Sequence, residues 1–206
     1  PEAFYNRLVE AFRSYMLVGG MPEAVVIYTE TGSYRYSSDI VNEIIQGYQD
    51  DFAKYGAKAN PLLLRQTLIS VAHQAGAKFV CSRVEGQYRS AEVKVALEML
   101  KDAGLIIPTY HTDANGVPLG AEINERVVKY LIHDTGVLLG ILGIDDDIDE
   151  RIKEMMVADS IDLVDKGHVA EMMAGLELIK YSSPQTRHQL YYWQNMNKGT
   201  CAEVDY

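Results

Sequence analysis

The sequence is poor in cysteine and has no long apolar run. Its two cysteines, Cys81 and Cys201, show no metal-ligand spacing, so neither a zinc site nor a framework of disulfides is expected. No apolar stretch is long enough to cross a bilayer, and no charged-then-apolar signal segment opens the chain. We therefore expect a reduced, cytoplasmic setting and no membrane partner.

Positive charge is also scarce. The formal net charge is -10, which argues against a protein that coats nucleic acid indiscriminately. The charge is uneven, however, because residues 58–126 hold 8 Lys or Arg and 7 Asp or Glu, a net of +1 that leaves -11 for the remainder. This segment is the only part that a phosphate backbone would not strongly repel, so nucleic-acid binding is permitted there.

Motifs for nucleotide and metal binding are missing. No Gly-x-x-x-x-Gly-Lys-Ser/Thr occurs, so the chain has no phosphate-binding loop. The acidic run at 145–150 lacks the Gly and the distal Glu of a calcium loop, and we interpret it as an exposed loop and the acidic start of a helix at 149–158. His111 and His133 have no Cys or carboxylate at ligand spacing, so a structural role is expected for both.

Apolar residues recur at helical spacing through most of the chain. Gly19 to Pro22 ends the first such stretch, Ser38 and Asp39 are the expected cap of the third, and Asp134 with Thr135 is the expected cap of a later one. The predicted helices are 2–18, 22–28, 40–55, 62–74, 136–142 and 168–181.

A helix followed by a β-hairpin lies at the centre of the chain. Val93, Ala96, Leu97 and Leu100 form one apolar face, with Ser90 as the expected N-cap and Gly104 just past the end. The predicted hairpin consists of a strand at 105–112, a turn at 113–116 and a return at 117–124, and a strand at 127–132 is expected to pair with the first. This order is typical of a winged helix-turn-helix.

The end of the sequence predicts a second hairpin. Its strands are 190–194 and 201–206, and alternation places Glu203 and Asp205 on the same side. The run Tyr191 to Trp193 suits either a stacking platform for bases or, as we favour, a half-buried packing surface. Because the chain opens on Pro1 and closes in mid-strand, we expect it to be a piece of a longer protein with an unpaired strand edge that another chain covers or that is disordered.

Two segments carry a distinctive order of residues, 19–25 (Gly-Gly-Met-Pro-Glu-Ala-Val) and 48–55, which begins Tyr-Gln-Asp-Asp-Phe. The first resembles the helical lid end, and the second the Tyr-Arg-Asp-Asp-Phe segment, of a large group of bacterial and archaeal AAA-type ATPases. Further segments of this sequence resemble the C-terminal domain of unknown function of these proteins. They are residues 103–106, 118–119, 134–139, 166–171, 190–193 and 202–206. No single motif is specific, but the ordered set spans nearly the whole chain.

The resemblance implies an α+β, mostly helical fold in three parts. Residues 1–57 would be the helical end of the ATPase lid, 58–133 a winged-helix domain, and 134–206 a truncated restriction-endonuclease-like domain consisting of a helix and a hairpin. ATP and Mg²⁺ are expected for the parent protein, and no cofactor is expected for this fragment.

The resemblance also implies two site residues. Glu171 matches the helix glutamate of the nuclease signature and Asp205 its strand aspartate, and such carboxylates would hold a divalent cation that activates water. The Glu-x-Lys strand that completes the site would follow Tyr206, so catalysis by this chain alone is not expected. The plain alternative is that both carboxylates are ordinary solvated side chains.

The nucleic-acid candidates are Lys78, Arg83, Arg89, Lys94 and Lys101. The outward face of the helix at 90–103 mixes both signs of charge, as an ordinary exposed helix does, so a packing module that relays motion to an ATPase core is the alternative. We expect a regulatory region that binds nucleic acid, or else a non-catalytic protein-interaction scaffold or part of a metal-dependent nuclease. The candidate partners are DNA, the ATPase module of the same protein and a second copy of the chain.

Overall fold

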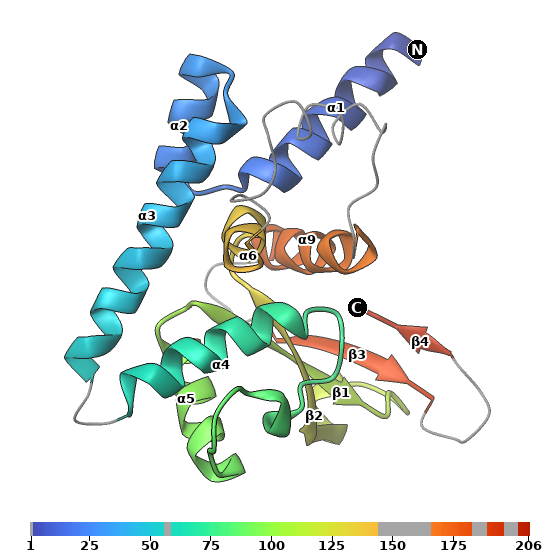
Figure 1. Cartoon of the computed structure of the whole chain (residues 1–206). Coiled ribbons are helices and arrows are strands. Elements are labelled where there is room, and N and C mark those ends of the chain that lie inside the picture. The colour runs from blue at the N-terminus through green and yellow to red at the C-terminus, as the bar shows by residue number, and fades with distance from the viewer. Residues whose placement is uncertain (1, 56–58, 144–165, 183–188, 196–201) are drawn as a thin grey trace. The chain divides into compact units, whose positions relative to one another are not determined.

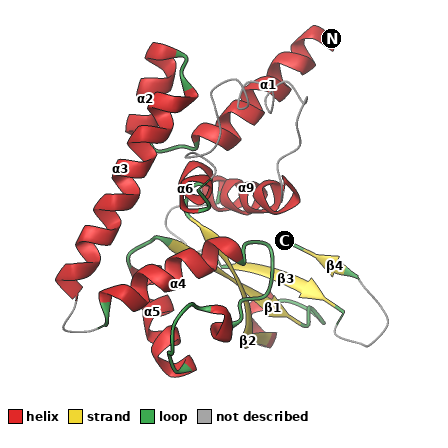
Figure 2. Cartoon of the chain, viewed as in Figure 1, coloured by secondary structure: helices red, strands yellow, loops and turns green. Residues whose placement is uncertain are grey.

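The fold is mixed α+β and mostly helical. The computed structural model describes residues 2–55, 59–143, 166–182, 189–195 and 202–206, which contain seven α-helices and a four-stranded sheet (Figure 2). The chain divides into two compact units, residues 1–65 with 134–170 and residues 66–133 with 171–206. The acidic run at 145–150, the helix predicted at 149–158 and Cys201 lie outside the described residues. In the described part, no helix combines the length and the apolarity needed to cross a membrane.

The first unit is helical. It contains α1 (Glu2–Val18), α2 (Pro22–Thr31), α3 (Tyr34–Phe52), the short turn η1 (Ala53–Tyr55) and α6 (Thr135–Ile141) (Figure 1). The prediction for α1 is confirmed, whereas α3 begins six residues before the predicted start at 40. The reason is that Ser33 is the actual N-cap, with its side chain accepting a hydrogen bond of 3.3 Å from the backbone N–H of Tyr36.

A capping aspartate joins two distant segments of this unit. The Asp134 carboxylate accepts a 3.0 Å bond from the N–H of Val137, which caps α6 as predicted, and a 2.6 Å bond from the N–H of Gly20. A Cβ atom on Gly19 would lie 2.2 Å from Asp134 Oδ1, and one on Gly136 would lie 2.5 Å from the carbonyl oxygen of Val18. The glycines on both sides are therefore required by close backbone approach.

The second unit is built on one mixed sheet. Its strands are β1 (Ile106–Thr112), β2 (Ile123–Ile132), β3 (Leu190–Gln194) and β4 (Glu203–Val204), in the order β2-β1-β3-β4. The pairs β1–β2 and β3–β4 are antiparallel, and β1–β3 is parallel. The remaining elements are α4 (Pro61–His73), α5 (Ser90–Asp102), α9 (Lys166–Tyr181) and the short turns η2 (Cys81–Arg83) and η3 (Leu119–Glu122). Of α4 and α9, only the parts from residue 66 and from residue 171 onward belong to this unit.

The ends of α5 differ in part from the prediction. Ser90 is the first helical residue, and Arg89 holds the N-cap position because Glu92 reaches back to accept a 2.8 Å bond from its backbone N–H. Gly104 follows the helix as predicted, with φ +75°. The N–H groups of Gly104 and Leu105 donate to the carbonyls of Lys101 and Leu100 at 2.9 and 3.0 Å, which closes the C-terminus.

The central hairpin has a later return strand than predicted. The pairing of β1 with residues 127–132 is confirmed, from Ile106 opposite Ile132 to Tyr110 opposite Val128. Residues 117–124 were expected to return as a strand, but 119–122 form η3 and β2 begins only at residue 123. A register shift between Tyr110 and His111 accommodates the extra residues, as a β-bulge does. The last strand is also shorter than predicted, covering Glu203 and Val204.

Alternation along the strands gives the sheet two different faces. Thr109 lies opposite Lys129 and beside Leu190, and His111 lies beside Tyr192, so these side chains share one face. The same face meets the C-terminal part of α9, where a Cβ atom on Gly175 would lie 2.8 Å from Leu131 Cδ1. Tyr110, Val128 and Tyr130 belong to the opposite face, on the side of α5. The unit therefore carries two separate clusters of polar and aromatic side chains.

Candidate nucleic-acid interface and carboxylate cluster

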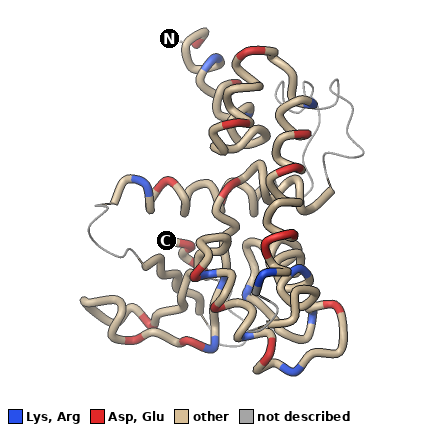
Figure 3. The backbone as a smooth tube through the Cα atoms, turned by 90° about the vertical axis from the view of Figure 1, so that its left-hand side faces the viewer, with Lys and Arg blue, Asp and Glu red and all other residues tan. Residues whose placement is uncertain are grey.

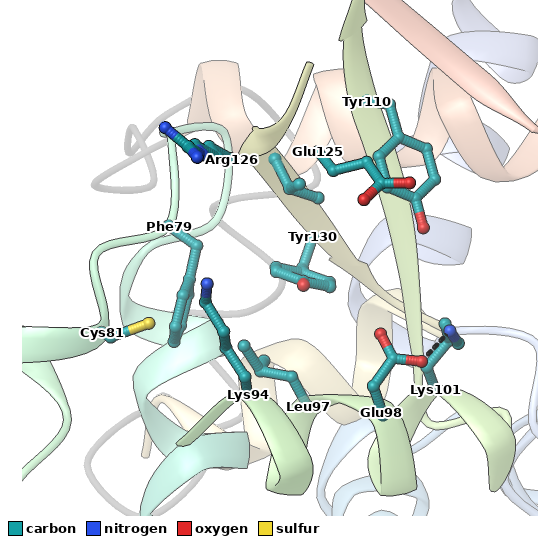
Figure 4. A pocket seen from close by; sticks show the side chains of 11 residues that line it. Phe79, Cys81, Lys94, Leu97, Glu98, Lys101, Tyr110, Glu125, Arg126 and Tyr130 are labelled. Atoms are coloured by element: carbon teal, nitrogen blue, oxygen red, sulfur yellow. Dashed lines mark hydrogen bonds and ion pairs between the residues drawn. The ribbon is translucent and has the colours of Figure 1, made fainter. Parts of the chain in front are cut away.

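A groove lies between α5 and the β1–β2 hairpin. Its volume is about 680 Å³, and its apolar and aromatic lining includes Phe79, Leu97, Tyr110 and Tyr130. Lys94, Lys101 and Arg126 bring positive charge to it, and Glu98 and Glu125 bring negative charge (Figure 4). The groove thus combines flat apolar surface with groups of both signs. Such a lining suits a ligand with an aromatic part and a charged part.

The cations of the groove differ in their pairing. Lys101 forms an ion pair with Glu98 one helical turn away, drawn as a dashed line in Figure 4. Lys94 and Arg126 are exposed and have no ion-pair partner among the residues that the structure describes. These two charges are therefore available to an anion.

The structure brings only part of the predicted basic set together. Lys94 and Lys101 line the groove, whereas Lys78 and Arg89 are exposed outside its lining. Arg83 lines a different cavity of about 270 Å³, together with His73 and Glu85. Arg126, Phe79 and Tyr130 were not predicted as site residues. Their strand-and-loop positions gave no periodic signal that would have joined them to α5 before the tertiary structure was known. The distribution of both charge signs over the chain can be followed in Figure 3.

A buried lysine forms a second cluster on the other face of the sheet. Lys129 Nζ lies 2.9 Å from Glu171 Oε1 on α9, 2.6 Å from Glu203 Oε1 on β4 and 3.2 Å from Asp205 Oδ1 just beyond it. The side chain of Lys129 is 6% exposed, and those of Glu171, Glu203 and Asp205 are 13%, 35% and 48% exposed. The ammonium also lies 5.0 Å from the centre of the Tyr192 ring, a cation–π contact.

Burial and charge act in opposite directions within this lysine cluster. Burial lowers the pKa of Lys129, but hydrogen bonds to Glu203 and Glu171 outweigh it, so the net pKa is raised. Burial raises the pKa of Glu171, and the attraction of Lys129 offsets this only in part because Asp205 and Glu203 add negative charge. Burial likewise raises the pKa of Tyr192 to about 12. One ammonium serves three carboxylates, so the cluster stays short of positive charge.

Glu171 and Asp205, the two predicted site residues, therefore meet through Lys129. Glu203 and Asp205 point to the same side, as the strand alternation predicted. Within the described residues, no group of three His, Cys, Asp or Glu side chains has the geometry to hold a metal ion. Sequence reasoning missed Lys129, although a lysine inside the apolar run at 127–132 signals a cation that needs buried partners.

The two histidines have backbone partners rather than ligand geometry. His111 is buried, with Nε2 3.3 Å from the carbonyl oxygen of Gln194 and its ring edge-on to Tyr192. His133 Nδ1 lies 3.2 Å from the carbonyl oxygen of Leu105. Tyr192 is buried, while Tyr191 and Trp193 are half-buried. This burial fits the packing surface favoured for 191–193.

Comparison with models of protein families identifies a family for this chain. Residues 9–148 match the family described as "Domain of unknown function (DUF8612)", a span of about two thirds of the chain. No curated protein and no solved structure matches. Neither an AAA-type ATPase family nor a nuclease family is shown by these comparisons. The matched span includes the whole groove, from Phe79 to Tyr130, and Lys129, but none of the three carboxylates around it. The chain belongs to the family of the domain of unknown function DUF8612.

Proposed function

We propose that this chain is a C-terminal regulatory region of an AAA-type ATPase and that the groove beside α5 contacts nucleic acid. Two exposed cations, Lys94 and Arg126, carry the nucleic-acid part of the proposal: they line a groove of aromatic rings and have no ion-pair partner in the described part of the chain. Phosphate groups supply most of the affinity of nucleic acid for a protein, and unpaired Lys and Arg side chains are what attract them.

The order of elements supports a winged-helix arrangement for this part. α4, η2 and α5 are followed by the β1–β2 hairpin, and the N–H of Phe79 donates a 2.9 Å hydrogen bond to the carbonyl of Val128 on β2. A winged helix places its third helix and its hairpin against DNA. The groove lies between those same two elements.

The charge on α5 sets the kind of binding that we propose. Its exposed face carries Glu92 and Glu98 beside Lys94 and Lys101, so a deep approach to base edges is opposed by like charge. Affinity then comes from a few phosphate contacts. We expect weak binding that depends steeply on salt and little on sequence.

The test measures binding of a labelled duplex by fluorescence anisotropy across a salt series. The variant Lys94→Gln/Arg126→Gln removes two exposed cations, and its plot of log affinity against log salt should lose about two units of slope, about one for each lost phosphate contact. The matched control Arg7→Gln/Lys54→Gln removes the same charge from the exposed surface of the first unit and should keep the slope. Absence of binding at low salt would refute the proposal and favour a protein-interaction scaffold.

A second candidate function is metal-dependent cleavage of nucleic acid by the full-length protein. The observation that favours it is the convergence of Glu171 and Asp205, matched to the nuclease signature, on one lysine. The test is nicking of supercoiled DNA in Mg²⁺ by the longest form of the protein, compared with its Glu171→Gln variant. Equal nicking by both proteins would exclude Glu171 as a ligand of the catalytic metal.

A further inference from the structure

The groove beside α5 has the dimensions of a small-ligand site. A volume of about 680 Å³ falls inside the range of about 300–1,000 Å³ that is usual for small-molecule pockets. A space of this size is too small for a double helix and suits a single unpaired nucleotide.

The walls of the groove offer flat apolar surface. The rings of Phe79 and Tyr130 lie with centres 5.5 Å apart at an angle of 87°, so the face of one ring meets the edge of the other. Both residues are half-buried, and so is Tyr110, which leaves part of each ring accessible. The hydroxyl groups of Tyr110 and Tyr130 are protonated at neutral pH and can donate hydrogen bonds, and burial raises the pKa of both above its ordinary value.

The polar groups are placed at the rim, around the rings. Lys94 on α5 and Arg126 on β2 stand on opposite walls of the groove without ion-pair partners in the described structure. Glu125, next to Arg126 on the hairpin, is exposed and can accept hydrogen bonds from amino or hydroxyl groups. Cations, rings and an acceptor are thus the three kinds of group that phosphate, base and sugar require.

We propose that this groove binds one unpaired nucleotide, with its base against Phe79 and Tyr130 and its phosphate between Lys94 and Arg126. The inference rests on the proposed contact with nucleic acid and narrows it to an unstacked, single-stranded position. Stacking on aromatic side chains tolerates every base, so the site selects strand state rather than sequence. The nucleotide can belong to a strand or be free, and the experiment separates these two sources.

The probe is 2-aminopurine, whose fluorescence falls when the base stacks. It is placed in a single-stranded oligonucleotide, in the same strand fully paired, and in a free 2-aminopurine nucleoside monophosphate. We expect quenching and binding with the single strand and no change in fluorescence with the duplex. Quenching with the free nucleotide as well as the strand supports the site and shows that strand context is not needed. Equal quenching of single strand and duplex would overturn the inference.

The variants test the proposed contacts. Phe79→Leu removes one stacking ring, and the affinity for the single strand should fall about 5- to 100-fold while duplex affinity is unchanged. Tyr36→Leu, at a side chain of the first unit that is 56% exposed, is the matched control and should change neither affinity. The side chain of Lys94 is exposed, so the Lys94→Gln variant should fold normally. It should lower the affinity for the single strand and for the duplex.

The two proposals fail differently in these experiments. If the duplex binds with the expected salt dependence while no form of 2-aminopurine is quenched, the nucleotide site is refuted and the proposed function stands. If neither single strand nor duplex binds at low salt, both are refuted. If Phe79→Leu lowers the duplex affinity as much as the single-strand affinity, the ring is not a selective stacking surface and the inference is overturned.

Discussion

Lys129 lies within β2, where most of the residues next to it in the sequence are apolar. Its β2 neighbours Val128 and Leu131 are buried, and its own side chain is almost completely covered. A buried ammonium is tolerated when hydrogen-bonded carboxylates surround it. Here the partners come from α9 and from the end of the chain, so one side chain ties three sequence segments together.

Replacing this lysine should therefore destabilise the protein. For Lys129→Met we expect a loss of about 3 kcal/mol in the free energy of unfolding, the low end of the range for a broken buried pair because Glu203 and Asp205 retain some hydration. The measurement is urea unfolding followed by circular dichroism. Lys180→Met, which removes the exposed partner of Glu177, is the control and should cost less than about 1 kcal/mol. An equal loss of unfolding free energy in the two variants would show that the buried cluster stabilises the protein no more than an exposed ion pair does.

Glu171 should make stability depend on pH. Because burial raises its pKa above the unfolded value of 4.5, the folded state binds more protons than the unfolded state in the window that begins there. The contribution of this carboxyl to the unfolding free energy is then complete below pH 4.5 and is lost as the pH rises through the folded pKa. The difference in unfolding free energy between wild type and Glu171→Gln should fall across this window. A difference that rises with pH would contradict the assignment.

At the scale of elements, helix ends decide how the segments of each unit meet. Asp134 connects residues 19–25 with residues 134–139, which are two separate motifs in the sequence. Its carboxylate accepts hydrogen bonds from the backbone N–H groups of Gly20 and Val137. Gly104 follows α5 in a left-handed conformation, and β1 begins two residues later. In both places the identity of a small or capping residue is required by backbone geometry.

The capping role of Asp134 can be measured directly. Asp134→Ala leaves the N–H groups of Gly20 and Val137 without their shared acceptor at a buried position, and we expect a loss of about 2 kcal/mol in unfolding free energy. Asp134→Asn keeps one acceptor oxygen and should lose less. If alanine and asparagine cost the same, the carboxylate is not acting through these two bonds.

Two glycines should respond to alanine with opposite signs. At Gly104, φ is +75° and no atom lies near the place of a Cβ, so Gly104→Ala should cost about 1 kcal/mol from backbone strain alone. Gly47 lies on the exposed face of α3 with the same open surroundings, so Gly47→Ala should raise stability by about 0.5–1 kcal/mol. Thermal unfolding of both variants checks the pair, and a gain at Gly104 would contradict the left-handed cap.

At the scale of the whole molecule, the family match and the sheet do not have the same limits. Residues 9–148 cover β1, β2 and the groove, whereas β3, β4 and α9 lie beyond the match. Yet β3 pairs with β1, so the sheet of the second unit is completed by residues outside the matched span. The groove depends on the matched part, and the lysine cluster depends on both.

Truncation tests this dependence. A chain that ends at residue 148 leaves Lys129 without Glu171, Glu203 and Asp205 and leaves the β1 edge unpaired, so we expect weakened unfolding cooperativity and self-association through the open edge. Sedimentation velocity and thermal unfolding measure the two effects. Lys129→Met in the truncated chain should recover part of the stability by removing the unpaired charge. A truncated chain as stable and monomeric as the full one would show that the second unit does not need residues 171–206 for its stability.

Local features of the fold could be derived from the sequence. The helix periods, the cap at Asp134, the glycine after α5 and the pairing of β1 with residues 127–132 follow from spacing and backbone preferences among neighbours. Alternation also placed Glu203 and Asp205 on one side of their strand. Boundaries shifted where a nearby group outcompeted the expected one, as Ser33 did for α3 and Glu92 did for α5.

The sequence by itself determined most of the helices and the pairing of β1 with residues 127–132, because those preferences act between residues close together in the chain. Only the tertiary structure decided that Lys129 gathers carboxylates from residues 171, 203 and 205, and that Phe79 and Arg126 complete the groove beside Lys94. These groups come from elements separated by long stretches of chain, and they meet because the sheet pairs β1 with β3 and because α5 and α9 cover opposite faces. The spacing of residues along the chain does not predict contacts between segments so far apart in the sequence.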